Sequence, residues 1–197
     1  ATSRFRLCAG PILVLLAACT ASCAQVKQHF VEESTAEPPT ELQPVKAEIE
    51  PIEIWTRNVG DGVSEEFLKL RPAYAGQRLF AAEREGEVSA YNLQDGNQLW
   101  SVRTELDISG GPGVAEGHVL VGTSDGEVVA FEATRGAVKW RARLSSEVLA
   151  APTGAQGIVV ARTNDGKLFG LSLSDGKRLW VYDRSVPVLT LRGTSSP

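Results

Sequence analysis

The sequence predicts an all-β fold, a β-propeller of four-stranded blades, and three observations support this prediction. Equivalent glycines, tryptophans and prolines recur every 40 residues. Within each repeat, apolar residues alternate or run over short stretches rich in valine and aromatics, which is typical of strands. Turn signals such as Asp-Gly separate these stretches. About four short strands in a unit of about 40 residues are typical of a propeller blade.

Three segments of the chain align without gaps and define the repeat. They are "GEVSAYNLQDGNQLW" from Gly86, "GEVVAFEATRGAVKW" from Gly126 and "GKLFGLSLSDGKRLW" from Gly166. We expect the tryptophan that ends each segment to fill the space between adjacent blades. Trp55, in "IEIWTRNVG", resembles the last strand of a further blade. About three blades are therefore expected here, and because three blades cannot close a ring, we expect the N-terminal part of a longer protein.

The first residues predict an export signal with a lipid attachment site. Arg4 and Arg6 precede the apolar run "LCAGPILVLLAA", which is shorter than the roughly 20 residues of a membrane-spanning helix. The following "LAAC" resembles a bacterial lipobox, so we expect a signal peptide over residues 1–18 and lipidation of Cys19. The alternative is an ordinary signal peptide with an incidental cysteine. Cys23 fits less well, because a threonine stands at the aliphatic position before it.

Composition separates a tether from the folded part of the chain. Residues 24–50 are rich in Glu, Pro, Gln and Thr and cannot bury enough apolar surface to order themselves. We therefore expect a lipidated cysteine and flexible acidic tether over 19–50, and a partial propeller domain over 51–197. The formal net charge of −4 and the lack of a basic block argue against nucleic-acid binding. Binding of a polyanion by a local patch stays open.

Two connections between repeats are longer than the others. Trp100 and Pro112 are 12 residues apart, as are Trp140 and Pro152, whereas the Trp55–Pro72 and Trp180–Pro197 separations are 17. These connections join the outer strand of one blade to the inner strand of the next, on one face of the propeller. Insertions confined to one face often mark the binding face of a repeat protein.

The second long connection contains "VLTLRG", which is a candidate partner-binding loop. Alternation places Leu189 and Leu191 on the same side, and Arg192 adds a planar group of donors beside them. Aliphatic anchors next to an arginine suit a protein-binding hot spot. The alternative is that the leucines pack under the loop and Arg192 pairs locally.

Further motifs carry a resemblance to known families. The "DGxxxW" pattern at Asp95–Trp100 and Asp175–Trp180 resembles the PQQ-like propeller repeat, although the middle copy has Arg135 in place of Asp. The lipobox, the acidic tether, "IWTRNVG", the repeats and "VPVLTLRGTSSP" together resemble the BamB family, lipoproteins of the outer-membrane β-barrel assembly machinery.

This resemblance implies a fold, a location and a binding role. It implies an eight-bladed propeller of PQQ-like blades, of which about three are present. It implies a non-enzymatic, lipid-anchored scaffold in the outer membrane that faces the periplasm and assists folding and insertion of outer-membrane proteins. Leu189, Leu191 and Arg192 would bind the periplasmic domains of the core subunit of the machinery. Nascent outer-membrane proteins are a second candidate partner.

The alternative function is that of a PQQ-dependent quinoprotein dehydrogenase. Such an enzyme needs oxygen ligands for Ca²⁺ and an acidic base near the quinone. The aspartates of the repeats precede turn glycines, which explains them: Asp95, Asp125, Asp165 and Asp175. No cysteine follows Cys23 to form a vicinal disulfide. We therefore predict no catalytic residue, metal site or cofactor. A sugar- or peptidoglycan-binding propeller is a third class, without supporting residues.

Overall fold

The computed structural model describes residues 41, 49–61, 68–183 and 197, and all strands in them belong to the unit Pro51–Pro197. These residues form three four-stranded antiparallel sheets. The first is β1 Ala73–Ala75, β2 Arg78–Ala82, β3 Glu87–Asn92 and β4 Gln98–Arg103; the second is β5 Ile108–Ala115, β6 His118–Thr123, β7 Glu127–Glu132 and β8 Val138–Arg143; the third is β9 Thr153–Ala155, β10 Ile158–Arg162, β11 Lys167–Ser172 and β12 Arg178–Asp183. None of the described segments is a helix that could span a membrane.

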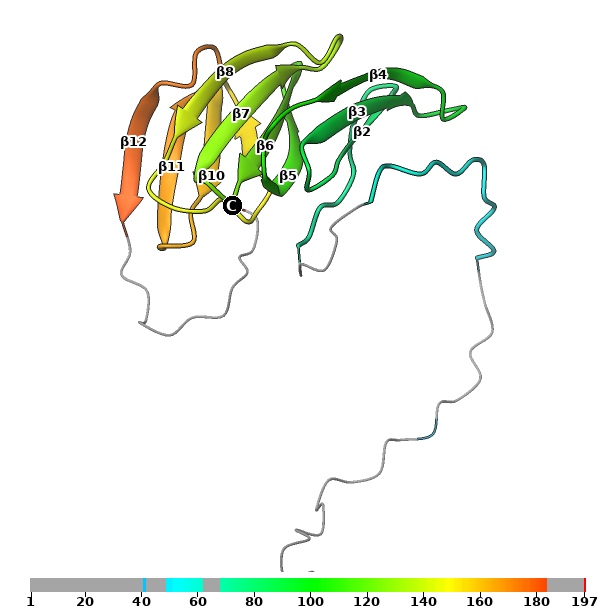
Figure 1. The fold of residues 1–197 in the computed structure, drawn as a ribbon, viewed down its shortest axis with the longest axis horizontal. Helices are drawn as coiled ribbons and strands as arrows, with labels where there is room; N and C mark the ends of the chain where they lie inside the picture. Colours follow the sequence, from blue (N-terminus) through cyan, green and yellow to red (C-terminus); the bar gives the residue numbers. More distant parts are fainter. Residues whose placement is uncertain (1–40, 42–48, 62–67, 184–196) are drawn as a thin grey trace, which may run out of the picture. The chain divides into compact units, whose positions relative to one another are not determined.

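Each sheet is one sequence repeat, folded as an up-and-down meander. The strands lie in chain order within every sheet, and the first strands of successive sheets contact one another, β1 with β5 and β5 with β9. Figure 1 shows the three sheets side by side, with β4, β8 and β12 as their last strands. The predicted β-propeller architecture is therefore confirmed, with three blades in the described chain.

The hydrophobic core lies between the blades rather than inside any one of them. In β6, Val119 and Val121 pack with Phe80 of the first blade, while Leu120 packs with residues of the third. All three β6 side chains are 0% exposed. Because successive side chains of a strand point to opposite faces, a middle blade must be apolar on both faces. This explains why "HVLVGT" runs apolar instead of alternating with polar residues.

Tryptophans fasten each blade to the next, as the sequence predicts. The Trp100 indole N–H donates to the carbonyl of Ala133 at 3.1 Å, and the Trp140 indole N–H donates to that of Leu173 at 2.7 Å. Each ring lies over a turn glycine of the following blade. A Cβ on Gly136 or Gly176 would come within 2.6 Å of the ring, and both glycines have positive φ. Only glycine satisfies both demands.

The first and last tryptophans, Trp55 and Trp180, make different contacts. Trp55 repeats the contact on the first blade, since its indole N–H donates to Leu93 at 3.0 Å and its ring lies over Gly96. Residues 49–61 nevertheless form no strand, because no described strand pairs with them. Trp180 is 41% exposed and lies over Gly170 of its own blade. None of the described residues accepts a hydrogen bond from it.

We expect the inter-blade hydrogen bond to be measurable by comparing two tryptophans. Trp140→Phe leaves the Leu173 carbonyl without its donor and should lower the free energy of unfolding by about 2 kcal/mol. Trp180→Phe, the matched control, removes no such bond from the described chain and should change it by less than about 0.5 kcal/mol. Urea denaturation followed by circular dichroism measures both. Equal losses in the two variants would contradict the assigned role of the indole N–H.

Candidate functional site

One end of the blades gathers the connections between repeats, and we call it the connection face. It consists of residues 83–86, 104–107, 124–126, 144–149 and 164–166. Backbone hydrogen bonds join the connection after one blade to the central turn of the next: Ser124 donates to Asp107 and Asn164 donates to Glu147, both at 2.9 Å. These bonds recur at the repeat spacing and make the face a regular platform.

The predicted binding residues lie outside the described part of the chain. Leu189, Leu191 and Arg192 fall within 184–196, and residues 62–67 of the first long connection are likewise outside. The predicted lipidation site, Cys19, is also outside the described residues. What the structure does describe is where each long connection starts, at Asp61 and at Asp183.

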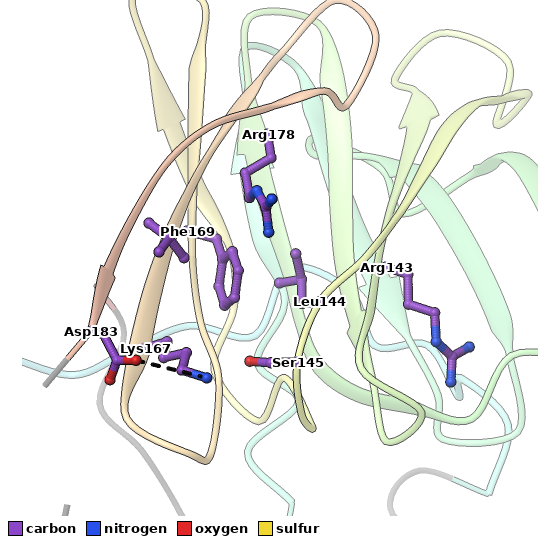
Figure 2. Close-up of a pocket in the computed structure, with 8 residues that line it drawn as sticks. Arg143, Leu144, Ser145, Lys167, Phe169, Arg178 and Asp183 are labelled. Atoms are coloured by element: carbon purple, nitrogen blue, oxygen red, sulfur yellow. Dashed lines mark ion pairs between the residues drawn. The ribbon is translucent and has the colours of Figure 1, made fainter. Parts of the chain in front are cut away.

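The start of the second long connection carries a reversed ion pair. Three equivalent cross-strand partners flank the connection face: Glu87 with Arg103, Glu127 with Arg143, and Lys167 with Asp183. The closest charged atoms are 3.2, 3.6 and 3.9 Å apart, respectively. The third pair keeps the attraction but exchanges the signs, as Figure 2 shows for Lys167 and Asp183. The last described strand therefore ends on an acid where the other two end on an arginine.

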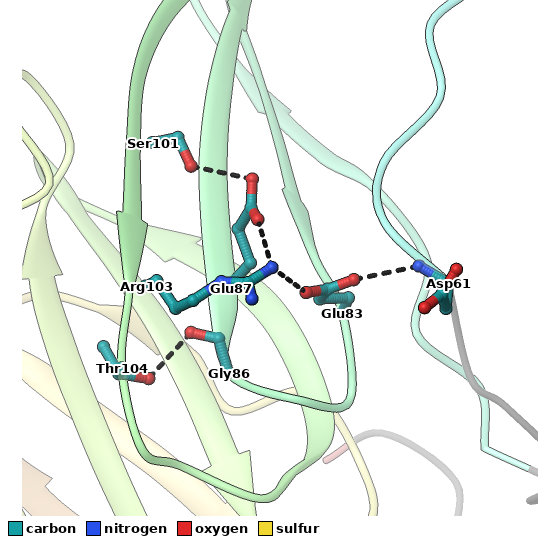
Figure 3. A network of polar contacts seen from close by, with 7 residues as sticks. All are labelled: Asp61, Glu83, Gly86, Glu87, Ser101, Arg103 and Thr104. Atoms are coloured by element: carbon teal, nitrogen blue, oxygen red, sulfur yellow. Dashed lines mark hydrogen bonds and ion pairs between the residues drawn. The ribbon is translucent and has the colours of Figure 1, made fainter.

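The start of the first long connection is held by a buried carboxylate. Glu83 is 2% exposed and occupies the position that threonine takes in the other two blades. In the second blade, the Thr123 hydroxyl accepts the Glu127 backbone N–H at 2.9 Å within its own turn. Glu83 instead reaches outward and accepts the Asp61 backbone N–H at 3.0 Å (Figure 3). The substitution thus fixes the point from which residues 62–67 depart.

The same network fixes the charge state of a neighbouring acid. The Arg103 guanidinium lies between two carboxylates, 3.5 Å from Glu83 and 3.2 Å from Glu87 (Figure 3). The Ser101 hydroxyl donates to Glu87 at 2.8 Å. The hydrogen bonds from Ser101 and Arg103 hold the pKa of Glu87 below its ordinary value. The ionised form of Glu87 is therefore favoured in the folded chain.

The turn aspartates are not brought together. Asp95 and Asp175 accept the backbone N–H groups two residues on, at 2.9 and 3.2 Å, in turns before the last strand of a blade. Asp125 and Asp165 lie in the turns at the connection face instead. Across residues 49–61 and 68–183, no three His, Cys, Asp or Glu side chains are grouped so as to hold a metal ion. Local turn geometry accounts for these aspartates.

Comparison with known proteins identifies relatives. The family model described as "Outer membrane protein assembly factor BamB" matches residues 52–105 and 84–197. A Pseudomonas aeruginosa protein of that name is 44% identical over 86 residues, covering 44% of this chain and 23% of the relative. A Yersinia pestis protein of the same name is 33% identical over 169 residues, covering 79% of this chain and 42% of the relative. The chain thus spans less than half the length of these relatives.

A solved structure supports the same relationship. The crystal structure of BamB from Moraxella catarrhalis superimposes with a TM-score of 0.61 at 32% sequence identity. The match covers 65% of this chain and 39% of that one.

We expect Glu83→Thr to release the first long connection without disturbing the blade, because the other blades carry threonine here. The Asp61 amide should exchange with solvent roughly tenfold faster once its acceptor is lost. Glu83→Gln retains an acceptor oxygen and should keep most of the protection. The Glu127 amide, bonded to Thr123, serves as an internal reference. Hydrogen exchange followed by NMR tests this, and an unchanged Asp61 rate in Glu83→Thr would refute it.

The lowered pKa of Glu87 predicts a loss of stability in acid. A carboxyl whose pKa is lower in the folded state stabilises the fold above its unfolded pKa of about 4.3, and this contribution is lost as the pH falls through the folded value. Glu87→Gln should therefore flatten the dependence of unfolding free energy on pH below about 5. Ser101→Ala should flatten it in part. Urea denaturation between pH 3 and pH 6 provides the measurement, and superimposable curves for all three proteins would rule the network out as the cause.

Proposed function

We propose a function from the premise that this chain belongs to the BamB family of outer membrane protein assembly factors. The chain acts as a non-enzymatic scaffold that binds the core subunit of the outer-membrane β-barrel assembly machinery. Through that contact it assists the folding and insertion of outer-membrane proteins. Its partners are the periplasmic domains of the core subunit, with nascent outer-membrane proteins as a second class.

One observation carries the proposal: the two long connections start from the same face, at residues that depart from the repeat. Glu83 replaces threonine and holds Asp61. Lys167 and Asp183 reverse the ion pair of the preceding blades. Because both departures occur where a long connection begins, they suit a face that has been adapted for a partner rather than for the fold.

The binding group of this face is the second long connection. We propose that Leu189 and Leu191 form its apolar anchor and that Arg192 donates to carboxylate or carbonyl oxygens of the partner. The preceding blades are joined by indole hydrogen bonds, at 3.1 Å from Trp100 and at 2.7 Å from the buried Trp140. A rigid support lowers the entropic cost of association, because fewer groups must be ordered when the partner binds.

The N-terminal segment positions this scaffold at the membrane. We propose that residues 1–18 are removed as a signal peptide, that Cys19 carries lipid in the outer membrane, and that 19–50 form an acidic tether on the periplasmic side. The propeller domain then comprises 51–197. Anchoring two partners to one membrane raises their effective concentration and allows a modest contact surface to suffice.

Co-purification tests the assignment of the second long connection. The double variant Leu191→Glu, Arg192→Glu places two acids in the proposed contact, and we expect it to reduce recovery of the core subunit by roughly tenfold or more. Arg141→Glu is the matched control: Arg141 is exposed on β8, belongs to neither long connection, and should leave recovery unchanged.

Circular dichroism must show the same fold for all three proteins. Equal recovery with both variants would place the partner surface elsewhere on the chain. Failure of the unaltered chain to recover the core subunit would overturn the proposed function itself.

A further inference from the structure

The reversed ion pair changes the charge at the boundary between the second and third blades. Arg143 ends β8, Lys167 begins β11 and Arg178 begins β12, and all three residues line one pocket at this boundary. One repeat earlier, the corresponding residues are Arg103, Glu127 and Val138. Two of the three positions therefore gain a positive charge relative to the repeat, and they gain it on the same pocket.

The pocket combines an apolar wall with an open, charged rim. Its volume is about 330 Å³, close to the lower limit of small-molecule sites in proteins. Phe169, which is 3% exposed, lines it together with Leu144 and Val181. Figure 2 shows the Phe169 ring and Leu144 on either side of the space into which Arg178 extends. A ligand that fits this pocket needs an apolar part as well as a charge.

The three cations are not equally available to a ligand. Arg143 pairs with Glu127 at 3.6 Å, and its guanidinium points away from the other two in Figure 2. Lys167 lies 3.1 Å from Asp165 and 3.9 Å from Asp183, and its amino group points toward Ser145. Arg178 has no ion pair or hydrogen bond to any residue in the described part of the chain.

The charge of the pocket also sets the charge of its ligand. Arg178 presents a fork of donors that matches the two oxygens of a carboxylate. Lys167 is already shared with two acids, and Asp183 itself lines the pocket. Asp183 repels any anion in the pocket, and this repulsion grows with the charge of the anion. A singly charged anion therefore fits better than a dianion such as phosphate.

We propose that this pocket binds a carboxylate carried on a small apolar group, with the carboxylate on Arg178 and the apolar part against Phe169 and Leu144. A polypeptide chain end and a free carboxylic acid share this chemistry. The site includes Lys167 and Asp183, so it adjoins the point where the second long connection begins. It gives the chain a second means of recognition, directed at a small chemical group rather than at a protein surface.

NMR titration of the full 197-residue chain with N-acetylleucine and with N-acetylleucinamide tests the proposal. The two probes differ in the carboxylate. We expect millimolar binding of the acid, with shifts at Phe169 and Leu144, and no saturable binding of the amide. Arg178→Gln should weaken binding of the acid at least tenfold. Arg141→Gln, an exposed arginine outside the pocket, should leave it unchanged.

Two further titrations, with a peptide and with inorganic phosphate, distinguish the possible ligands. A short peptide ending in leucine that binds more tightly than N-acetylleucine would support a polypeptide chain end, and equal affinity would support a free acid. Inorganic phosphate binding more tightly than the acid would overturn the proposal in favour of a general anion patch. Equal binding of acid and amide in the unaltered chain, or unaltered affinity in Arg178→Gln, would also overturn it.

Discussion

The hydrogen bond from a buried tryptophan to a backbone carbonyl of the next blade is the constraint on which this structure depends. Trp140 places its ring over Gly176 while its N–H reaches Leu173, so one side chain fixes both the distance and the angle between two sheets. Among the described strands, none pairs by backbone hydrogen bonds with a strand of another sheet. Since the core lies between blades, losing this contact would open the core rather than a surface.

Because the repeat has a constant length of 40 residues, residues that differ between equivalent positions of the blades are informative. Where every blade meets the same packing demands, residues at corresponding positions tend to be alike, as Ala90 and Ala130 are beside their tryptophans. A residue that differs from its equivalents in the other blades, where packing does not require the difference, therefore indicates a role outside the fold. Glu83 in place of threonine, and Lys167 with Asp183 in place of Glu and Arg, both occur where a long connection begins. The fold tolerates these changes because they lie at the end of the blades, outside the inter-blade core.

These departures act through charge and position. Glu83 is buried, and its carboxylate oxygens accept hydrogen bonds from the Asp61 backbone N–H and the Arg103 guanidinium. Asp95 and Asp175 each accept a backbone N–H within their own turn. Such groups hold neighbouring segments in place. The cationic pocket beside Phe169 differs, because Arg178 extends into it with no described partner.

The pattern of residues within one repeat is enough to specify a blade. The 40-residue period, the alternation within strands and the turn glycines are local properties, and the three sheets, their strand order and the role of the tryptophans follow them. The roles of Cys19, Leu189, Leu191 and Arg192 stay predictions from sequence, since those residues lie outside the described chain. Sequence reasoning missed Glu83 and Arg178, although comparing equivalent positions would have marked both as exceptions.

What Glu83 and Arg178 contact depends on how the sheets and the N-terminal segment pack together. Whether Glu83 turns inward or reaches Asp61, 22 residues earlier, depends on how the N-terminal segment lies against the first blade. Whether Arg143, Lys167 and Arg178 line one pocket depends on how β8 of one blade packs beside the next. Strand periodicity specifies which face a side chain occupies, but it carries no information about which face of another sheet lies opposite. That pairing is set by the contacts between blades.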